Sequence, residues 1–399
     1  MAVARGGYVA SGARGHCCTS SWHVAVQQRS RREALPFVRT ASSPVLQCLA
    51  GWTVKSRLLS IATRAAADVY SADGPGSLGW DAFDSDRFQF LEQIGKGGWG
   101  TVHRALDHDT GLEVAIKTQS KWPVAKPGLR VPSQQAVLNR LKDEGQLLRH
   151  MQCSKRVVKL LHKMEDKDNS YLVTELLQGG DLEKILSSKR RLSEEYACLL
   201  TREVLLFLRD CHTNGICFTD VKPANFMLCK DADDGELTLK AIDFGCAQVL
   251  RPGDRLVKRA GTPAYFAPEV FLRNYGLEAD TWSAGIMLYR FITGQLPWFD
   301  LQPDTRIAPN KIQAAVLSGP MVWGPTWNYK SEACLDLAKA MLHRDPNRRI
   351  AIEDAVNHKW FMYYCGSEDH DVCHVDEGSL EELVNNVVPA SFSPKQMAL

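Results

Sequence analysis

A glycine-rich segment joins two stretches in which apolar and polar residues alternate as they do in β-strands. The segment is Gly95-Lys96-Gly97-Gly98-Trp99-Gly100-Thr101-Val102, and the flanking stretches are residues 88–94 and 101–106. Glycines in such a turn let backbone N–H groups approach phosphates, because no Cβ stands in the way. A dinucleotide-binding loop has similar glycine spacing but leads from a strand into a helix. The segment therefore indicates a nucleotide-binding turn between two strands.

The rest of the pattern predicts a two-lobed α+β fold. A third strand is expected at residues 113–118, a helix at 133–151, and two more strands at 157–164 and 171–177. After residue 182 the periodicity is mostly helical, with helices expected at 194–211, 280–293, 330–343 and 352–358. Five strands with one helix, followed by a larger and mainly helical half, indicate two lobes.

A lysine on the third expected strand is the first candidate for contact with phosphates. Lys117 ends the run Val114-Ala115-Ile116-Lys117. A lysine at this place can reach the α- and β-phosphates of a nucleotide if a carboxylate holds it. Glu144, on the expected helix, is the preferred partner and Asp143 is the alternative. Leu148 lies one turn after Glu144 and is expected on the same helix face.

Several short motifs follow in a fixed order. They are Phe218-Thr219-Asp220-Val221-Lys222-Pro223-Ala224-Asn225, Asp243-Phe244-Gly245, Gly261-Thr262-Pro263-Ala264-Tyr265, Ala267-Pro268-Glu269 and Asp280-Thr281-Trp282-Ser283-Ala284-Gly285. With the glycine-rich segment and Lys117, this series resembles the eukaryotic protein kinase family over residues 88–361. Lys222 resembles the serine/threonine branch. Residues 225–228 and the segment from 296–299 through 358–361 are similar to the calcium/calmodulin-dependent or plant and algal calcium-dependent group.

The resemblance implies a protein serine/threonine kinase with lobes at about 88–176 and 177–361. It implies transfer of the γ-phosphate of ATP to protein hydroxyls with Mg²⁺. Asp220, Lys222 and Lys117 would be catalytic, Asn225 and Asp243 would hold the metal, and Thr262 would lie in the substrate loop. The expected ATP-binding residues are Ile94, Gly95, Lys96, Gly97, Gly98, Trp99, Gly100, Thr101, Val102, Ala115, Lys117, Glu144, Glu175 and Leu176. Thr174 would precede the hinge between the lobes, and Arg349 would pair with Glu269.

Two positions in the expected catalytic loop (residues 218–225) depart from the family pattern. The usual His is Phe218 and the usual Arg is Thr219. That Arg commonly binds a phosphate on the activation segment. Residues 246–260, which we call the activation segment, contain no Ser, Thr or Tyr. We therefore predict activity that does not depend on phosphorylation of this segment. A scaffolding pseudokinase is the rival hypothesis.

Charge divides the chain into unlike parts. The formal net charge is +2, but residues 1–67 hold nine Lys and Arg against one acid, Glu33. This basic, Ser- and Ala-rich composition predicts a transit peptide for the chloroplast, with the mitochondrion as the alternative destination. A disordered basic tail without a targeting role is the other interpretation. Residues 68–87 are expected to be a linker, and residues 362–399 an acidic tail. The rest of the chain is net acidic, so no nucleic-acid partner is expected.

The expected partners are protein substrates and ATP. No apolar run reaches the length of a membrane span. The segment Asp231-Ala232-Asp233-Asp234-Gly235 superficially resembles a calcium-binding loop. Its Gly comes at position 5 rather than 6, and Ile242 stands where position 12 needs a Glu. The segment is interpreted as a polar turn between two strands, and no direct calcium binding is expected.

Overall fold

In the computed structural model, the described residues are 76–125, 131–230, 237–299 and 307–365. The chain divides into two units, residues 1–67 and 68–399, and every described residue belongs to the second unit. The predicted presequence, the predicted polar turn at 231–235 and all but the first residues of the predicted tail lie outside the described residues. These three assignments stay predictions.

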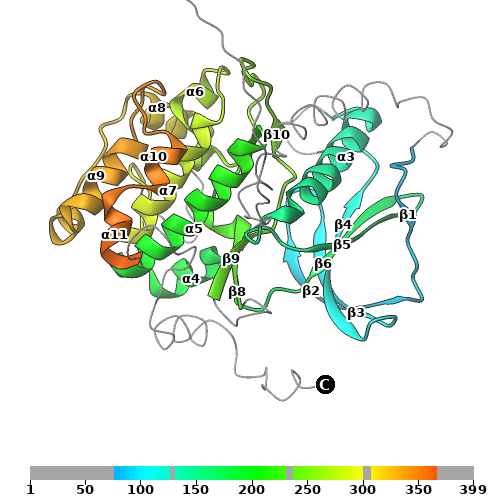
Figure 1. Ribbon diagram of the computed structural model, residues 1–399. Coiled ribbons are helices and arrows are strands. Elements are labelled where there is room, and N and C mark those ends of the chain that lie inside the picture. Colours follow the sequence, from blue (N-terminus) through cyan, green and yellow to red (C-terminus); the bar gives the residue numbers. More distant parts are fainter. Residues whose placement is uncertain (1–75, 126–130, 231–236, 300–306, 366–399) are drawn as a thin grey trace, which may run out of the picture. The chain divides into compact units, whose positions relative to one another are not determined.

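The first lobe is built on a six-stranded sheet with the order β1-β5-β6-β4-β3-β2 (Figure 1). Its strands are β1 (Asp81–Ala82), β2 (Phe88–Lys96), β3 (Thr101–Asp107), β4 (Leu112–Ser120), β5 (Leu160–Glu165) and β6 (Asn169–Glu175). All neighbouring pairs are antiparallel except β1 with β5, which is parallel. A cluster that includes Phe88, Ala105, Val114, Ile116 and Val173 is buried on this sheet.

The predicted two-lobed fold is confirmed, but the sheet has one strand more than predicted. The additional strand is β1, whose Asp81 and Ala82 lie opposite Met164 and Glu165 of β5. A strand of two residues is too short to show a hydrophobic period, so the sequence pattern gave no sign of it.

Helix α3 (Gln134–His150) packs beside this sheet and carries Glu144. Ser133 caps it, because its side chain accepts a hydrogen bond from the backbone N–H of Ala136. The buried residues include Leu141, Glu144 and Leu148, which repeat at three- and four-residue steps. Glu144 is thus a buried carboxylate on the face that the helix turns toward the lobe.

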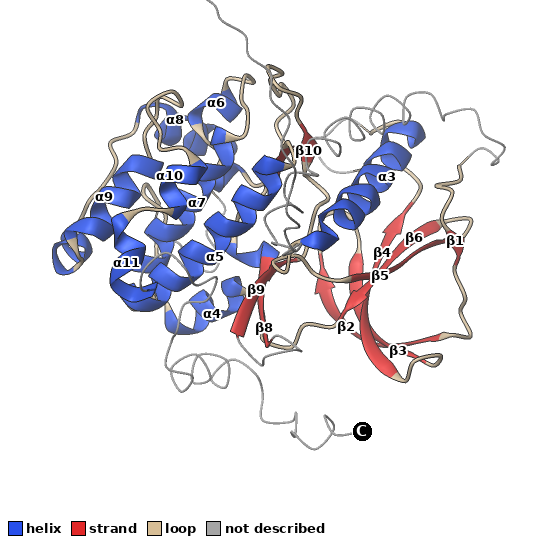
Figure 2. Cartoon of the chain, in the orientation of Figure 1, coloured by secondary structure: helices blue, strands red, loops and turns tan. Residues whose placement is uncertain are grey.

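The second lobe is mainly helical, as predicted (Figure 2). Its helices are α4 (Leu182–Lys189), α5 (Glu194–Thr213), α6 (Pro268–Phe271), α7 (Glu278–Thr293), α8 (Pro309–Ser318), α9 (Glu332–Met341), α10 (Ile352–Val356) and α11 (Lys359–Cys365). Short 3₁₀ turns lie at Pro223–Asn225, Pro263–Tyr265 and Pro325–Tyr329, and one further turn, Met151–Cys153, follows α3 in the first lobe. Helix α7 is buried on nearly every side, which places it at the centre of the core. Among the described residues, none of the helices combines the length and apolarity that crossing a membrane requires.

Two small strand pairs position the chemistry-bearing segments. Strands β8 (Phe226–Lys230) and β9 (Leu237–Ala241) form an antiparallel pair, and β7 (Ile216–Cys217) pairs with β10 (Gln248–Val249). Asn225 comes directly before β8, and Asp243 follows β9 after one intervening residue. Antiparallel pairing brings Phe226 opposite Ala241. The two predicted metal-binding residues therefore lie near the same end of one hairpin.

Candidate active site

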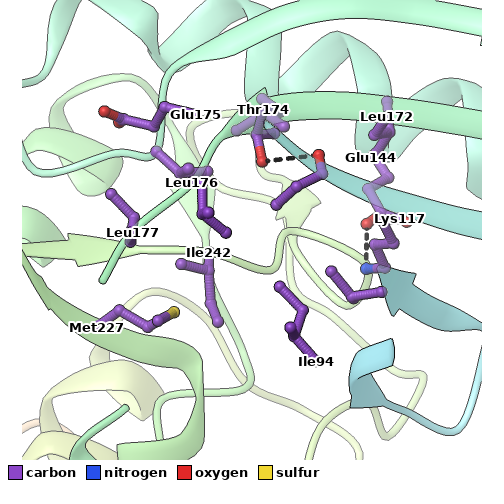
Figure 3. Close-up of a pocket in the computed structure, with 14 residues that line it drawn as sticks. Ile94, Lys117, Glu144, Leu172, Thr174, Glu175, Leu176, Leu177, Met227 and Ile242 are labelled. Carbon is purple, nitrogen blue, oxygen red and sulfur yellow. Dashed lines mark hydrogen bonds and ion pairs between the residues drawn. The ribbon is translucent and has the colours of Figure 1, made fainter. Parts of the chain in front are cut away.

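A cleft of about 590 Å³, counting space open to solvent, lies between the six-stranded sheet and the β8–β9 pair (Figure 3). Seven of the predicted ATP-binding residues line it: Ile94, Val102, Ala115, Lys117, Glu144, Glu175 and Leu176. The other lining residues are Leu148, Val158, Leu172, Thr174, Leu177, Met227 and Ile242. Aliphatic walls with a charged end suit a flat, largely apolar ring that carries an anionic group.

Five lining residues were not predicted from the sequence to line a nucleotide site, namely Val158, Leu172, Leu177, Met227 and Ile242. Met227 comes two residues after Asn225, and Ile242 comes directly before Asp243. The short sequence distance of Met227 and Ile242 from these motif residues is the feature of the sequence that could have identified them as lining residues. The other three are ordinary aliphatic residues of strands and loops, and only the fold turns them toward the cleft.

The ammonium of Lys117 is held by two carboxylates. Its Nζ lies 2.5 Å from Glu144 Oε1 and 2.8 Å from Asp243 Oδ1. The other oxygen of Glu144, Oε2, accepts a hydrogen bond from Gln119 Nε2 at 3.2 Å, and Arg140 Nη1 lies 3.8 Å from the same oxygen. Glu144, rather than the alternative Asp143, is therefore the helix carboxylate that meets Lys117.

These contacts fix the charge states at the inner end of the cleft. Burial disfavours the ammonium of Lys117, but Asp243 and Glu144 together outweigh burial and raise the pKa of Lys117 above its usual range. Burial also opposes ionisation of Asp243, yet the neighbouring Lys117 outweighs it and lowers the pKa of Asp243. At neutral pH Lys117 is therefore a cation paired with the ionised carboxylate of Asp243.

The glycine-rich turn joins β2 to β3. Gly95, Lys96, Gly97, Gly98, Trp99, Gly100 and Thr101 form this turn and its strand ends, and they are not among the lining residues. The N–H of Gly97 donates to the carbonyl of Gly100 at 2.9 Å. A Cβ on Gly100 would lie 2.1 Å from the carbonyl oxygen of Thr118, so only glycine fits there. Trp99 is 45% exposed, and the guanidinium of Arg140 in α3 stands 4.5 Å from its ring centre.

The predicted hinge residue Glu175 turns its side chain away from the cleft. Its Oε1 accepts hydrogen bonds from the N–H of Lys159 at 2.7 Å and from Lys240 Nζ at 2.8 Å. The hydroxyl of Thr174 donates to the carbonyl of Ala115 at 3.4 Å (Figure 3). The groups left to contact a ligand in the cleft are therefore the side chain of Leu176 and the backbone of residues 174–176.

The predicted catalytic residues meet around the carboxylate of Asp220. Thr262 Oγ1 donates to its Oδ1 at 2.7 Å, and Lys222 Nζ lies 2.8 Å from its Oδ2. Lys222 Nζ also donates to Thr262 Oγ1 at 2.9 Å. Asn225 Nδ2 donates to the backbone carbonyl of Asp220 at 2.7 Å and to its Oδ2 at 3.0 Å. Four residues from two distant segments thus form one hydrogen-bonded group.

Asp280, a fully buried residue of α7, binds the backbone of the catalytic loop through its carboxylate. Its two oxygens accept hydrogen bonds from the N–H groups of Phe218 and Thr219, each at 2.8 Å. His212 Nε2 lies 3.0 Å from one of the same oxygens. Thr219 has a φ of 62°, a left-handed conformation that is strained for a β-branched residue.

Phe218 packs in a cluster of four buried aromatic rings. The other members are Phe207, Phe226 and Phe244, and ring centres lie 5.0 Å from Phe218 to Phe207 and 5.3 Å from Phe218 to Phe244. Most of these contacts are edge-to-face, which is a favourable arrangement for aromatic pairs. A phenylalanine in place of the family's histidine therefore keeps the packing that links the catalytic loop to Phe244.

The activation segment is fastened at several points by contacts that need no phosphate. The hydroxyl of Thr219 donates to the carbonyl of Cys246 at 2.7 Å. Leu256 and Tyr275 exchange two backbone hydrogen bonds, of 2.7 and 3.1 Å. The hydroxyl of Tyr275 donates to the carbonyl of Lys258 at 2.6 Å and accepts from Gln248 Nε2 at 3.3 Å. Tyr275 thus contacts the segment near its beginning and near its end.

The donor set at Asp243 and Asn225 fits a hard cation. Asp243 Oδ1 is used by Lys117 and by the N–H of Gly245, and its side chain is 38% exposed. The amide nitrogen of Asn225 donates both of its hydrogen bonds to Asp220, so the amide oxygen is the group able to bind a metal ion. Carboxylate and amide oxygens are ligands that Mg²⁺ prefers. Asp243 and Asn225 are therefore the residues that would hold Mg²⁺.

Comparison with known proteins gives a consistent result. Residues 88–361 match the description "Protein kinase domain". "Calcium-dependent protein kinase 8" of Oryza sativa subsp. japonica is 34% identical over 274 residues, which cover 69% of this chain and 48% of that protein. "Calcium-dependent protein kinase 29" of Arabidopsis thaliana is 33% identical over 274 residues, covering 68% of this chain and 48% of that protein. The chain thus spans about half the length of these curated relatives.

The relatives contradict one expectation from the sequence. The absence of direct calcium binding was expected from the poor loop at residues 231–235, whereas the relatives are named for their calcium dependence. The expectation is therefore wrong as stated. The expectation rests on one polar segment, and residues 231–236, which contain that segment, lie outside the described residues.

Proposed function

The chain belongs to the protein kinase family, and from that premise we propose that it is an active serine/threonine protein kinase. Its substrates would be ATP and protein hydroxyls, and the product would be a phosphoprotein. The observation that carries the proposal is the pairing of Lys117 with Glu144 and Asp243 at 2.5 and 2.8 Å. This arrangement holds the phosphate-contacting cation beside the group of residues around Asp220.

Each polar residue has a role that its contacts support. The cation of Lys117 binds and orients the phosphates of ATP. Asp220 Oδ2 and Oδ1 accept hydrogen bonds, so this carboxylate can orient a substrate hydroxyl and take its proton. Lys222 Nζ lies beside the same carboxylate and can neutralise charge on the transferred group. When bound at Asp243 and Asn225, Mg²⁺ would neutralise negative charge on the phosphates.

The preference for Ser and Thr hydroxyls is supported by the group formed by Lys222, Thr262 and Asp220. Thr262 bridges the two charged residues, at 2.9 Å from Lys222 Nζ and 2.7 Å from Asp220 Oδ1. The proposed substrate loop thus lies directly against the proposed catalytic carboxylate. The relatives are named as protein kinases, which agrees with transfer of phosphate to a protein hydroxyl.

We further propose that activity does not require phosphate on the activation segment. Residues 246–260 offer no hydroxyl to modify. The family's phosphate-binding Arg is replaced by Thr219, whose own hydroxyl reaches the carbonyl of Cys246. Arg255 contributes further by pairing with Glu278 at 2.7 Å. Neutral hydrogen bonds and one ion pair thus support an ordered activation segment, which in other kinases a bound phosphate commonly orders.

The proposal is tested by phosphoryl transfer with the full chain, purified and treated with phosphatase. Transfer of ³²P from Mg·ATP to a basic Ser/Thr protein substrate is measured beside Asp220→Asn. The matched control is Asp109→Asn, whose carboxylate is 64% exposed in the other lobe. Because the relatives are named for calcium dependence, each assay is run with added calcium and with a chelator.

Transfer by the phosphatase-treated chain and by Asp109→Asn, with loss in Asp220→Asn, supports both parts of the proposal. Loss of activity on phosphatase treatment, restored by phosphorylation, would refute independence from phosphate. ATP binding without transfer in any buffer would favour the rival scaffold hypothesis, which Phe218 and Thr219 raise.

A further inference from the structure

A short segment before the matched domain is packed into the first lobe. We call residues 77–82 the strap; they precede the family match, which begins at residue 88. The strap ends in β1, at the edge of the sheet beside β5 (Figure 1). After it, the N–H of Phe83 donates to the carbonyl of Glu165 at 2.9 Å.

The polar side of the strap is centred on the carboxylate of Glu165, at the end of β5. It accepts hydrogen bonds from the N–H of Leu78 at 2.9 and 3.0 Å, from the N–H of Trp80 at 3.1 Å and from the hydroxyl of Ser77 at 2.9 Å. Lys121 Nζ supplies the opposite charge at 2.7 Å. Burial opposes ionisation of Glu165, but these donors outweigh it and lower its pKa. One ionised side chain thus fixes the course of the strap.

The apolar side of the strap packs on α3. Leu78 is buried in a cluster with Val137, Leu138 and Leu141 of that helix, and Trp80 packs against the same cluster. The contact continues along the helix to Gly145. A Cβ on Gly145 would lie 2.6 Å from Trp80 Cζ2 and 3.0 Å from Trp80 Cη2. The indole therefore lies directly against the helix backbone, one residue from Glu144.

Helix α3 is consequently held from two directions. On the cleft side, Glu144 is bound to Lys117 at 2.5 Å. On the strap side, Leu78 and Trp80 fill the surface from Val137 to Gly145. A shift of the helix away from Lys117 would have to displace the indole or break the bonds at Glu165.

We propose that the strap is a positioning element for phosphoryl transfer, in which Leu78 and Trp80 hold α3 so that Glu144 stays bound to Lys117. The inference rests on the proposed function for its kinetic consequence only. Leu78 and Trp80 touch neither substrate nor the reacting atoms, and they act through the helix. An intact kinase unit would therefore begin at about residue 77, before the matched domain.

The test compares Trp80→Ala with Trp122→Ala in the full chain. Trp122 is a matched control, because it lies in the same lobe, is 50% exposed and bonds to Asp168 rather than to α3. Trp80→Phe is measured as well, since it removes the outer ring atoms near Gly145 and keeps most of the packing. The readouts are kcat, KM for ATP and for the protein substrate, and hydrogen exchange of the amides of residues 140–148.

We expect Trp80→Ala to lower kcat by roughly 10- to 100-fold, because small misplacements of a positioning group have effects of this size. Exchange should accelerate in α3 while α5 and α7 keep their protection. Trp80→Phe should show the same pattern to a smaller extent. Equal kcat and equal exchange in Trp80→Ala and Trp122→Ala would overturn the proposal, as would faster exchange spread evenly over both lobes.

A double variant tests the contact itself. Gly145→Ala alone should disturb α3, because its Cβ meets the indole. Gly145→Ala combined with Trp80→Ala should be no worse than Trp80→Ala, since the clash with the indole is gone and the other close contact, 3.1 Å to Lys163 Cδ, is with a flexible side chain. Additive losses would contradict a direct contact. If the unmodified chain shows no transfer, the proposed function fails, and exchange in α3 alone then decides for or against the strap.

Discussion

The hydroxyl of Thr219 donates a hydrogen bond of 2.7 Å to the backbone carbonyl of Cys246. It joins the catalytic loop to the first residue of the activation segment, at the place where related kinases carry an arginine. The backbone of Thr219 lies at φ 62°, and the N–H groups of Phe218 and Thr219 bind Asp280. A strained residue held by a buried carboxylate is a feature of functional loops.

Thr219→Val should lower kcat several-fold. It keeps the shape of the side chain but removes the donor to Cys246, and one lost hydrogen bond should reduce the unfolding free energy by about 1 kcal/mol. Thr219→Ser keeps the hydroxyl and should retain most of the activity. Steady-state kinetics and thermal unfolding of the two variants check this. Equal activity in Thr219→Val and the unmodified chain would show that the bond has no part in catalysis.

Tyr275→Phe should impair phosphoryl transfer, although its effect on the free energy of unfolding should be no larger than that of a control variant. It removes the hydroxyl that contacts Lys258 and Gln248 while leaving the buried ring in place. Tyr289→Phe is the control, because it removes a similar bond, of 2.6 Å to Val322, away from the activation segment. Each variant should lose about 1 kcal/mol, but only Tyr275→Phe should raise the KM for the protein substrate or lower kcat. Matching kinetics in the two variants would count against the fastening role.

Glu269→Gln should strongly destabilise the second lobe. Arg349, whose side chain is fully buried, donates to Glu269 Oε1 at 2.5 Å and to its Oε2 at 3.0 Å. Neutralising one partner leaves a buried charge unpaired, with a loss of about 3–5 kcal/mol. Glu113→Gln, at a more exposed pair with Arg104, should change stability by about 1 kcal/mol or less. Urea unfolding measures both, and similar losses would show that the buried pair is not special.

Asp107→Asn should destabilise the first lobe at neutral pH but not in acid. Hydrogen bonds from Arg87 lower the pKa of Asp107 to about 2, below its value in an unfolded chain. Its contribution is therefore complete above about pH 4 and is lost as the pH falls toward 2. The stability difference from the unmodified chain should be about 1–2 kcal/mol at pH 6 and should shrink in acid.

The measurement is urea unfolding at several pH values between 6 and 2.5. Asp109→Asn is the control, because Asp109 lies 3.1 Å from the same Arg87 but is 64% exposed. Its effect should be small at every pH. A difference for Asp107→Asn that stays constant with pH would contradict the assignment.

The parts of the site that lie close together in the sequence could be predicted from it. Asp220, Lys222 and Asn225 lie within six residues of one loop, so their spacing carries the chemistry. The choice of Glu144 over Asp143 also followed from the helix period. The bond from Thr262 to Asp220 spans 42 residues, and the sequence did not predict it, because the motif placed Thr262 in the substrate loop without a partner.

Contacts set by the fold alone could not be predicted. Leu78 and Glu165 are 87 residues apart, and neither belongs to a motif. The position of Tyr275 depends on how the activation segment folds back on the second lobe. Met227 and Ile242 are aliphatic residues whose direction is set by the pairing of β8 with β9. Side chains of this kind acquire a role only when packing brings them to a site.

The parallel pairing of β1 with β5 also determines how many backbone N–H and C=O groups are left unpaired at this edge of the sheet, which we call its border. Without β1, the N–H and C=O groups along the outer side of β5 would be unpaired, and an unpaired border can recruit strands from other molecules. β1 covers part of this border with two residues, one of them the charged Asp81. Removal of residues up to 82 would therefore expose this border and also free the surface of α3 that Leu78 and Trp80 cover, so that solubility and activity should fall together.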